Sequence, residues 1–449
     1  MNKCTLPRYT LLCPGPVNVQ HRVALAYSRC ALSHREDSFS ILLSQVQRDL
    51  LFIAGVHAIE AYSALIITGS GTAANEAVLT SAVPPDALVI VLSNGEFGER
   101  LAVLSATYNT TEVFSSEWGE DLNLRQLEQL LANTPRALVA MVHHGTSTGL
   151  LNPIGQVGRL CKRYGAKLFV DAVSSFAADP ISLEDSGITF LSTSSGKATA
   201  SYPGLSIVLG KNEDFARLGE YPAKNHYLNL YRYFQASIED RLTPNTPAVS
   251  LIVTLHKSLL EIAREGLSQR YLRLCELASY MRAELAAREL YKPTVKPQSV
   301  ILTNAFLPDK LTFADLQLRL KAKGFVIYDA KGLLRGRFFQ VSIIGDITIA
   351  DIDRFLSLLT VFRKSGLSLY GTGIRDTKEL RCLIEMVVPA KIDQGGDPLQ
   401  QQADMDKRQP QDMDIPVEFR TTLKRLQDIK KKHRQCDINE IGRNFSKND

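Results

Sequence analysis

The sequence predicts an α/β protein in which a large domain with a mostly parallel sheet, flanked by helices, is followed by a smaller C-terminal α/β domain. The first observation behind this prediction is a series of short apolar runs separated by helix-like stretches, at residues 64–68, 88–92, 137–142, 167–171, 188–192 and 205–209. Such runs are typical of strands covered by helices on both faces, and the stretches between them are long enough for βαβ crossovers. Functional residues are therefore expected at the carboxyl ends of these strands, where sheets of this kind bind their ligands.

The second observation is a change of pattern near residue 247. From about residue 247 to about residue 287 the pattern is long and helical, with Leu251, Leu255, Leu259 and Ile262 at helical spacing, which predicts a connecting helix. Another αβ segment then extends to about Phe362. The chain is therefore expected to comprise an N-terminal segment (1–15), the large domain (16–246), the small domain (247–362), an additional C-terminal segment (363–391), a linker (392–415) and a basic helical tail (416–449).

The linker and the tail are predicted from composition. Residues 392–415 are rich in Gln, Asp, Gly and Pro and have hardly any large apolar side chain, which favours disorder. The tail places four apolar residues on one helical face, followed by a basic run at 430–434: Phe419, Leu423, Leu426 and Ile429. This pattern favours a solvated terminal helix, and docking on an unknown partner or a membrane surface is the alternative.

The bulk composition excludes several classes of protein. The chain has 449 residues, 45% of them hydrophobic, and its seven scattered cysteines form no Cys-x-x-Cys pair, so neither a disulfide framework nor a metal site is expected. The first ten residues lack the apolar stretch of a signal peptide, and no run is long enough to cross a membrane, so we expect a cytoplasmic protein without a transmembrane segment. Most of the net charge of +5 lies in the tail, which argues against nucleic acid as a partner.

Three short motifs follow the predicted strands. The turn Gly69-Ser70-Gly71-Thr72 precedes a helix whose free N–H groups suit a phosphate, although a plain tight turn has the same sequence. Asp171 ends an apolar strand, where it needs a cation such as a protonated pyridine nitrogen or serves as a cap or turn residue. Lys197, in a loop of Ser, Gly and Thr after the next strand, suits Schiff-base chemistry or lies on the surface. The order of the three motifs along the chain favours the functional interpretation.

These residues resemble the class V branch of the fold type I enzymes that depend on pyridoxal 5′-phosphate. The resemblance extends from about residue 11 to about residue 359 and is closest to the branch that acts on 2-aminoethylphosphonate and pyruvate. Its most specific parts are Leu-Asn-Pro-Ile at 151–154 and Asp-Ala-Val-Ser-Ser-Phe at 171–176. It implies a fold type I transferase and a homodimer that uses pyridoxal 5′-phosphate as its cofactor.

The resemblance also implies roles for individual residues. Ser70, Gly71 and Thr72 would hold the cofactor phosphate, and Phe97 would stack on the pyridine ring. Thr148 or a neighbouring hydroxyl would face the oxygen O3′ of the cofactor, and Asp171 would keep the ring nitrogen protonated. Lys197 would hold the cofactor as a Schiff base and act as the general base. At the subunit interface, two threonines would reach the phosphate of the neighbouring subunit, namely Thr243 and Thr246.

The sequence departs from the family pattern at the position that binds the substrate. The arginine that grips the acidic group of the substrate is replaced by Gln340, which donates hydrogen bonds without a charge. Arg335 and Arg337 lie nearby, but an odd offset from Gln340 turns Arg337 to the other face of a regular strand. Substrate binding is therefore assigned to Gln340, and Arg337 is the less favoured alternative, which would require a slip of the strand register.

Two further departures remove polar groups from the cofactor pocket. Gly145 stands where the family has an acid, and Gly196 stands where it has Asn or Gln. Two interpretations are open for His144: it supplies new chemistry in the gap beside Gly145, or, as the expected outcome, it is a solvated histidine.

The predicted function is that of an aminotransferase that moves an amino group between a small amine, such as 2-aminoethylphosphonate, and a small keto acid, such as pyruvate. Two alternatives remain open. The first is another reaction of the same cofactor, either lyase- or desulfurase-like or transamination of a different amine. The second is a catalytically weakened scaffold that binds a partner through its tail.

Overall fold

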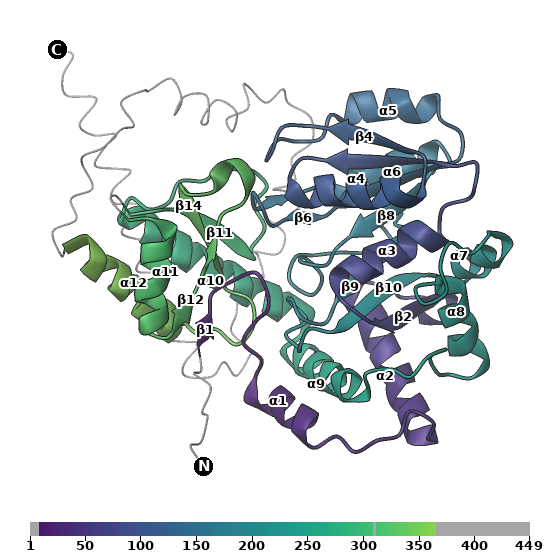
Figure 1. Cartoon of the computed structure of the whole chain (residues 1–449), viewed down its shortest axis with the longest axis horizontal. Coiled ribbons are helices and arrows are strands. Elements are labelled where there is room, and N and C mark those ends of the chain that lie inside the picture. Colours follow the sequence, from purple (N-terminus) through teal and green to yellow (C-terminus); the bar gives the residue numbers. More distant parts are fainter. Residues whose placement is uncertain (1–8, 309–310, 365–449) are drawn as a thin grey trace, which may run out of the picture. The chain divides into compact units, whose positions relative to one another are not determined.

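A seven-stranded sheet is the centre of the structure, a computed structural model that describes residues 9–308 and 311–364 (Figure 1). Its strands lie in the order β2-β10-β9-β8-β5-β3-β4, and only β10 runs antiparallel to its neighbours. The strands are β2 (Tyr62–Thr68), β3 (Leu88–Ser93), β4 (Thr111–Ser115), β5 (Ala137–Val142), β8 (Lys167–Asp171), β9 (Phe190–Ser194) and β10 (Leu205–Lys211).

Six of these strands coincide with the apolar runs of the sequence, so the predicted mostly parallel sheet is confirmed. Successive residues alternate between the two faces because side chains in a strand point alternately up and down. Within β2, for example, Ile66 belongs to one buried cluster, whereas Leu65 and Ile67 belong to the other.

Helices cover both faces of this sheet (Figure 1). One face is covered by α2 (Asp37–Ile53), α5 (Leu124–Ala132), α6 (Ile154–Arg163) and α9 (Val249–Glu265). The opposite face is covered by α3 (Gly71–Ser81), α4 (Glu96–Tyr108), α7 (Asn212–Arg217) and α8 (Leu230–Glu239). Complete burial of each large aliphatic side chain in these two layers stabilises the fold by about 1.5 to 3 kcal/mol.

A separate hydrophobic cluster is formed mainly by residues from the C-terminal part of the described chain. It surrounds an antiparallel sheet in the order β11-β14-β13, which comprises β11 (Leu302–Phe306), β13 (Tyr328–Asp329) and β14 (Phe338–Ser342). Three helices pack in this cluster, namely α10 (Leu267–Ala287), α11 (Phe313–Ala322) and α12 (Ile349–Lys364). The predicted smaller α/β part of the fold is therefore present.

The first described residues, up to the end of α1 (His21–Ser28), connect the C-terminal cluster with the helices that cover the large sheet. Strand β1 (Thr10–Leu11) pairs with β12 (Phe325–Val326), and α1 then packs on α9. Five short elements complete the described chain: the antiparallel pair β6 (His144–Gly145) and β7 (Leu150–Leu151), and three single turns of 3-10 helix at Ile59–Ala61, Leu218–Glu220 and Gly332–Leu334.

The single long helix suggested by the pattern at 247–287 is divided into α9 and α10. The two helices meet at Gly266, whose φ of +81° belongs to a region that glycine adopts without strain. None of the described helices is long and apolar enough to span a membrane. The predicted linker (392–415), the tail (416–449) and residues 365–391 of the additional segment lie outside the described residues.

Candidate active site

A cavity of about 590 Å³ opens at the edge of the sheet where β2, β5, β8 and β9 end. Six residues singled out from the sequence line it, although they are distant in the chain: Ser70, Gly71, Thr72, Phe97, Asp171 and Lys197. The parallel topology explains this convergence, because parallel strands bring their carboxyl ends to one edge.

Asp171 is the buried carboxylate of the cavity, with only 6% of its surface exposed. One of its oxygens accepts a hydrogen bond from the Val173 N–H (2.9 Å), and the other accepts one from the Asn75 side chain (2.6 Å). Burial raises the pKa of Asp171, while these two hydrogen bonds and the charges of Lys197 and Arg100 lower it. A positively charged group in the cavity would favour the ionised form of this carboxylate.

Asn75 was not predicted from the sequence. It lies one helical turn after Gly71 in α3, and its side-chain oxygen accepts a hydrogen bond from the Ser192 hydroxyl (2.6 Å). The i, i+4 spacing from the glycine turn is the signal that could have identified it, because such residues share one face of a helix. Asn75 therefore fixes the orientation of the Asp171 carboxylate from the neighbouring helix.

Lys197 approaches the cavity from the loop after β9. Its Nζ donates a hydrogen bond to the carbonyl of Pro14 (2.7 Å), and burial lowers its pKa. Gly15 covers the side chain so closely that a Cβ there would lie 2.5 Å from Lys197 Cδ. The N-terminal segment thus holds the amine against the site, and burial favours the neutral amine that a nucleophile requires.

The N-terminus of α3 forms another end of the cavity. Ser70 precedes the helix, and the N–H groups of Gly71 and Thr72 belong to the first turn, where a helix offers no internal acceptor. A Cβ on Gly71 would lie 2.7 Å from Val173 Cγ1, so this close approach requires glycine. Arg100 donates a hydrogen bond to Thr72 Oγ1 (3.1 Å), which adds a cation to the same end. An anion such as a phosphate fits here.

Phe97 is the aromatic side chain of the cavity wall, and it comes from the first turn of α4. The guanidinium of Arg100 lies over this ring, 5.3 Å from the ring centroid. This contact holds the Phe97 ring in place, so that a flat ligand in the cavity can stack on it.

Five other predicted site residues do not line the cavity of this chain. Thr148 is buried, and its hydroxyl accepts a hydrogen bond from the Leu150 N–H. Thr243 and Thr246 lie between α8 and α9, and the Thr243 hydroxyl donates to the carbonyl of Asn245. Arg337 is exposed, just before β14.

Gln340 is the fifth of these residues. It is 2% exposed, and its amide donates hydrogen bonds to the carbonyl of Thr146 (2.8 Å) and to the side chain of Asn304 (3.1 Å). Asn304 in turn donates to the carbonyl of Thr148 (3.0 Å). Gln340 thus joins β14 to the turn between β6 and β7, and its amide is already used in these contacts. Arg335 pairs with Asp329 at 3.4 Å and is exposed.

The expectation of a solvated His144 was wrong. Its side chain is 2% exposed and lines the cavity, because β5 ends in the core and the short β6–β7 pair keeps the following residues beneath the surface. The adjacent His143 is also buried, and its Nδ1 shares a hydrogen bond with Ser175 (2.9 Å). Burial lowers the pKa of both imidazoles to about 3, so both are neutral near neutral pH.

Because both histidines are buried and neutral, we expect the protein to lose stability in acid. Because the folded pKa values lie below the unfolded value of about 6.5, the unfolded chain binds more protons between pH 6.5 and 3. The contribution of the two histidines to the free energy of unfolding is complete above pH 6.5. As the pH falls below this value, each histidine lowers the free energy of unfolding by about 1.4 kcal/mol per pH unit. Urea unfolding of the apoprotein at pH 6.0 and 4.5 measures this slope. The double variant His143→Asn/His144→Gln should lose most of it, and an unchanged slope would contradict the assignment.

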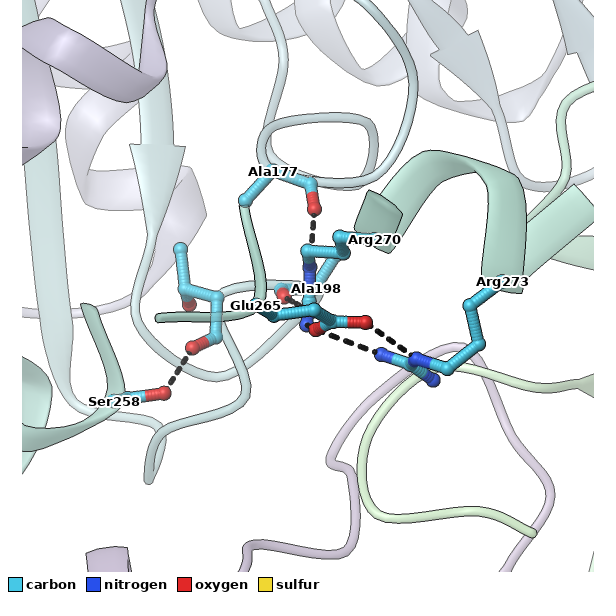
Figure 2. A network of polar contacts seen from close by, with 7 residues as sticks. Ala177, Ala198, Ser258, Glu265, Arg270 and Arg273 are labelled. Carbon is cyan, nitrogen blue, oxygen red and sulfur yellow. Dashed lines mark hydrogen bonds and ion pairs between the residues drawn. The ribbon is translucent and has the colours of Figure 1, made fainter. Parts of the chain in front are cut away.

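The loop that carries Lys197 is anchored from the opposite side by Arg270 of α10 (Figure 2). Arg270 is 6% exposed and donates hydrogen bonds to the carbonyls of Ala198 (2.5 Å) and Ala177 (2.8 Å). It pairs with Glu265, which also binds Arg273. A buried guanidinium therefore holds the residue next to Lys197, and no local sequence pattern predicts this contact.

Pyridoxal 5′-phosphate fits this set of groups. The cavity presents an anion site at α3, an aromatic wall at Phe97, a carboxylate for a cationic nitrogen at Asp171 and an amine at Lys197. Its ionisable lining comprises two basic side chains, Lys197 and Arg100, the carboxylate of Asp171 and the neutral His144, so the cavity suits an anionic ligand. These are the four features that the phosphate, ring, ring nitrogen and aldehyde of the cofactor require.

Comparisons with known proteins agree with this chemistry. The family model described as aminotransferase class-V matches residues 36–328. The chain is 28% identical to the 2-aminoethylphosphonate–pyruvate transaminase of Phocaeicola vulgatus, over 79% of this chain and 99% of that enzyme. It is 31% identical to the transaminase of the same name from Salmonella agona, over 79% and 98%.

Solved structures of aminotransferases resemble the chain in fold. The alanine–glyoxylate aminotransferase from Nostoc sp. has a TM-score of 0.75 at 27% identity and matches 81% of this chain and 97% of that protein. The ureidoglycine–glyoxylate aminotransferase from Bacillus subtilis has a TM-score of 0.77 at 21% identity, over 86% and 99%, which shows a shared fold.

Proposed function

Because the chain belongs to the class V aminotransferase family, whose members use pyridoxal 5′-phosphate, we propose that it moves an amino group between 2-aminoethylphosphonate and pyruvate. The observation that carries the proposal is the convergence of Lys197, Asp171 and the α3 N-terminus on one cavity. The choice of substrates rests on the names of relatives that are 28% and 31% identical to the chain.

The bound cofactor withdraws electrons from the amino-bearing carbon of the substrate, so that a proton can leave this carbon. We assign the transfer of that proton to Lys197, because its amine is partly buried in the cavity and burial favours its neutral form. Asp171 keeps the ring nitrogen protonated by offering a buried negative charge.

In this proposal, further residues bind the phosphate, stack on the ring and hold Lys197 in place. Ser70, Gly71 and Thr72 bind the phosphate through the first turn of α3, and Arg100 supplies a positive charge beside them. Phe97 stacks on the ring and is itself held by Arg100. The side chain of Lys197 is held by Pro14 and Gly15, so the amine stays at the cavity.

A homodimer is part of the proposal. It would bring Thr243 and Thr246, which lie away from the cavity of their own chain, to the phosphate of the second subunit. Gln340 then leaves the acidic group of the substrate to other partners, because its amide already binds Thr146 and Asn304.

Single-turnover spectroscopy of the holoenzyme tests the substrate pair. Addition of 2-aminoethylphosphonate should convert the cofactor to pyridoxamine 5′-phosphate, which removes its visible absorption, and pyruvate should restore it. Propylamine, which lacks an acidic group, should react at least about tenfold more slowly, because a lost charge-assisted contact of about 1.4 kcal/mol costs a factor of ten. Equal rates with both amines would argue against a phosphonate substrate, and no conversion with 2-aminoethylphosphonate would refute the proposed pair.

A further inference from the structure

His144 is the cavity-lining residue for which the proposed function gives no role. Its side chain is 2% exposed, and of the residues that the structure describes, none forms a hydrogen bond with either of its ring nitrogens. A buried polar atom without a partner costs about 1 to 3 kcal/mol. A neutral imidazole carries one donor and one acceptor, so both are available to a group bound in the cavity.

The groups around His144 are already engaged with other partners. His143 binds Ser175, and Arg282 donates to the carbonyls of Ser299 and Leu302. Lys197 donates to the carbonyl of Pro14. The imidazole of His144 therefore faces the cavity as an unused polar group.

The order of the strands shows which side of the cofactor His144 would meet. The phosphate site follows β2, Asp171 ends β8 and His144 follows β5. In the sheet, β2 and β5 lie on opposite sides of β8. His144 and the phosphate site are therefore on opposite sides of Asp171.

In the chemical structure of pyridoxal 5′-phosphate, two substituents likewise lie on opposite sides of the axis through the ring nitrogen. The ring nitrogen and the carbon that bears the aldehyde lie across the ring from each other. The phosphate arm is attached on one side of the line between them, and the hydroxyl oxygen O3′ is attached on the other. With the nitrogen at Asp171 and the phosphate at α3, O3′ points toward the end of β5.

We propose that His144 donates a hydrogen bond to O3′ of the cofactor. In this chain, His144 takes the part that the family resemblance gives to Thr148 or a neighbouring hydroxyl, because Thr148 is turned toward Leu150 and does not line the cavity. Gly145 leaves room beside the imidazole, since a Cβ there would have its nearest neighbour at 3.4 Å. The inference rests on the proposed orientation of the cofactor by Asp171 and Lys197.

A double comparison of ligand and protein tests this contact without measuring activity. The dissociation constants of pyridoxal 5′-phosphate and of 3-deoxypyridoxal 5′-phosphate, which lacks O3′, are measured for the apoprotein by fluorescence titration. His144→Leu should weaken binding of the natural cofactor about tenfold and binding of the deoxy compound less than about twofold. His144→Gln, which keeps an N–H donor, should retain most of the difference between the two ligands.

The matched control is His143→Asn, which changes the adjacent buried histidine outside the cavity and keeps a polar atom for Ser175. It should affect both ligands equally. His144→Phe keeps a flat ring without a donor and replaces the leucine variant if that variant does not fold. Equal weakening of both ligands by His144→Leu or His144→Phe, or no weakening of either, would overturn the contact with O3′. Failure of the wild-type apoprotein to bind the natural cofactor would overturn the inference together with the proposed function.

Discussion

Replacement of Lys197 with alanine should lower the rate of amino transfer at least about a thousandfold while the chain stays folded. The proposed function gives Lys197 the transfer of a proton, and the described cavity contains no second lysine that could replace it. The fold should survive, because Lys197 lies in a loop and its Nζ has one hydrogen bond, to the carbonyl of Pro14. Formation of alanine from pyruvate, measured with saturating 2-aminoethylphosphonate, gives the rate.

The matched control for this variant is Lys162→Ala, which removes an exposed lysine from the last turn of α6 and should leave the rate within about twofold of wild type. Added ethylamine should restore part of the rate of the Lys197→Ala variant, because a small amine in the vacated space can carry the proton. A rate within tenfold of wild type for the lysine variant would contradict the assignment.

The sequence predicts the large sheet well because its strands are buried on both faces. Such runs, as at 137–142, are apolar throughout and contrast with the helices around them. The missed strand is β4 at the sheet edge, where Glu112 and Val113 are exposed and no apolar run exists. The break between α9 and α10 at Gly266 was missed because one glycine within a helical pattern is compatible with a continuous helix.

The candidate site could be predicted where residues follow strands directly. Ser70, Asp171 and Lys197 lie within a few residues of strand ends, so the topology alone brings them together. Gln340 could not be placed in this way, because its orientation depends on the packing of β14 against the turn between β6 and β7. The contact of Arg270 with Ala198 also joins segments far apart in the sequence, and no periodicity reports it.

Replacement of Arg270 with methionine should lower the free energy of unfolding by about 3 to 5 kcal/mol. Arg270 is 6% exposed, and its guanidinium donates hydrogen bonds to the carbonyls of Ala177 and Ala198 (Figure 2). It also forms an ion pair with the carboxylate of Glu265. Methionine fills a similar volume but leaves both carbonyls without this donor, and Glu265 keeps only Arg273. Urea unfolding of the holoenzyme, followed by circular dichroism, measures the change.

The control for this prediction is Arg264→Met, at the end of α9. Arg264 pairs with Glu261 on the surface, with 61% of its side chain exposed, so its loss should cost less than about 1 kcal/mol. The two arginines differ in burial rather than in charge, and a large difference between the variants would assign the effect to the buried contacts. Because Arg270 holds the residue next to Lys197, its replacement should also weaken cofactor binding, whereas Arg264→Met should not. Equal losses of stability in the two variants would contradict the stabilising role of the buried contacts of Arg270.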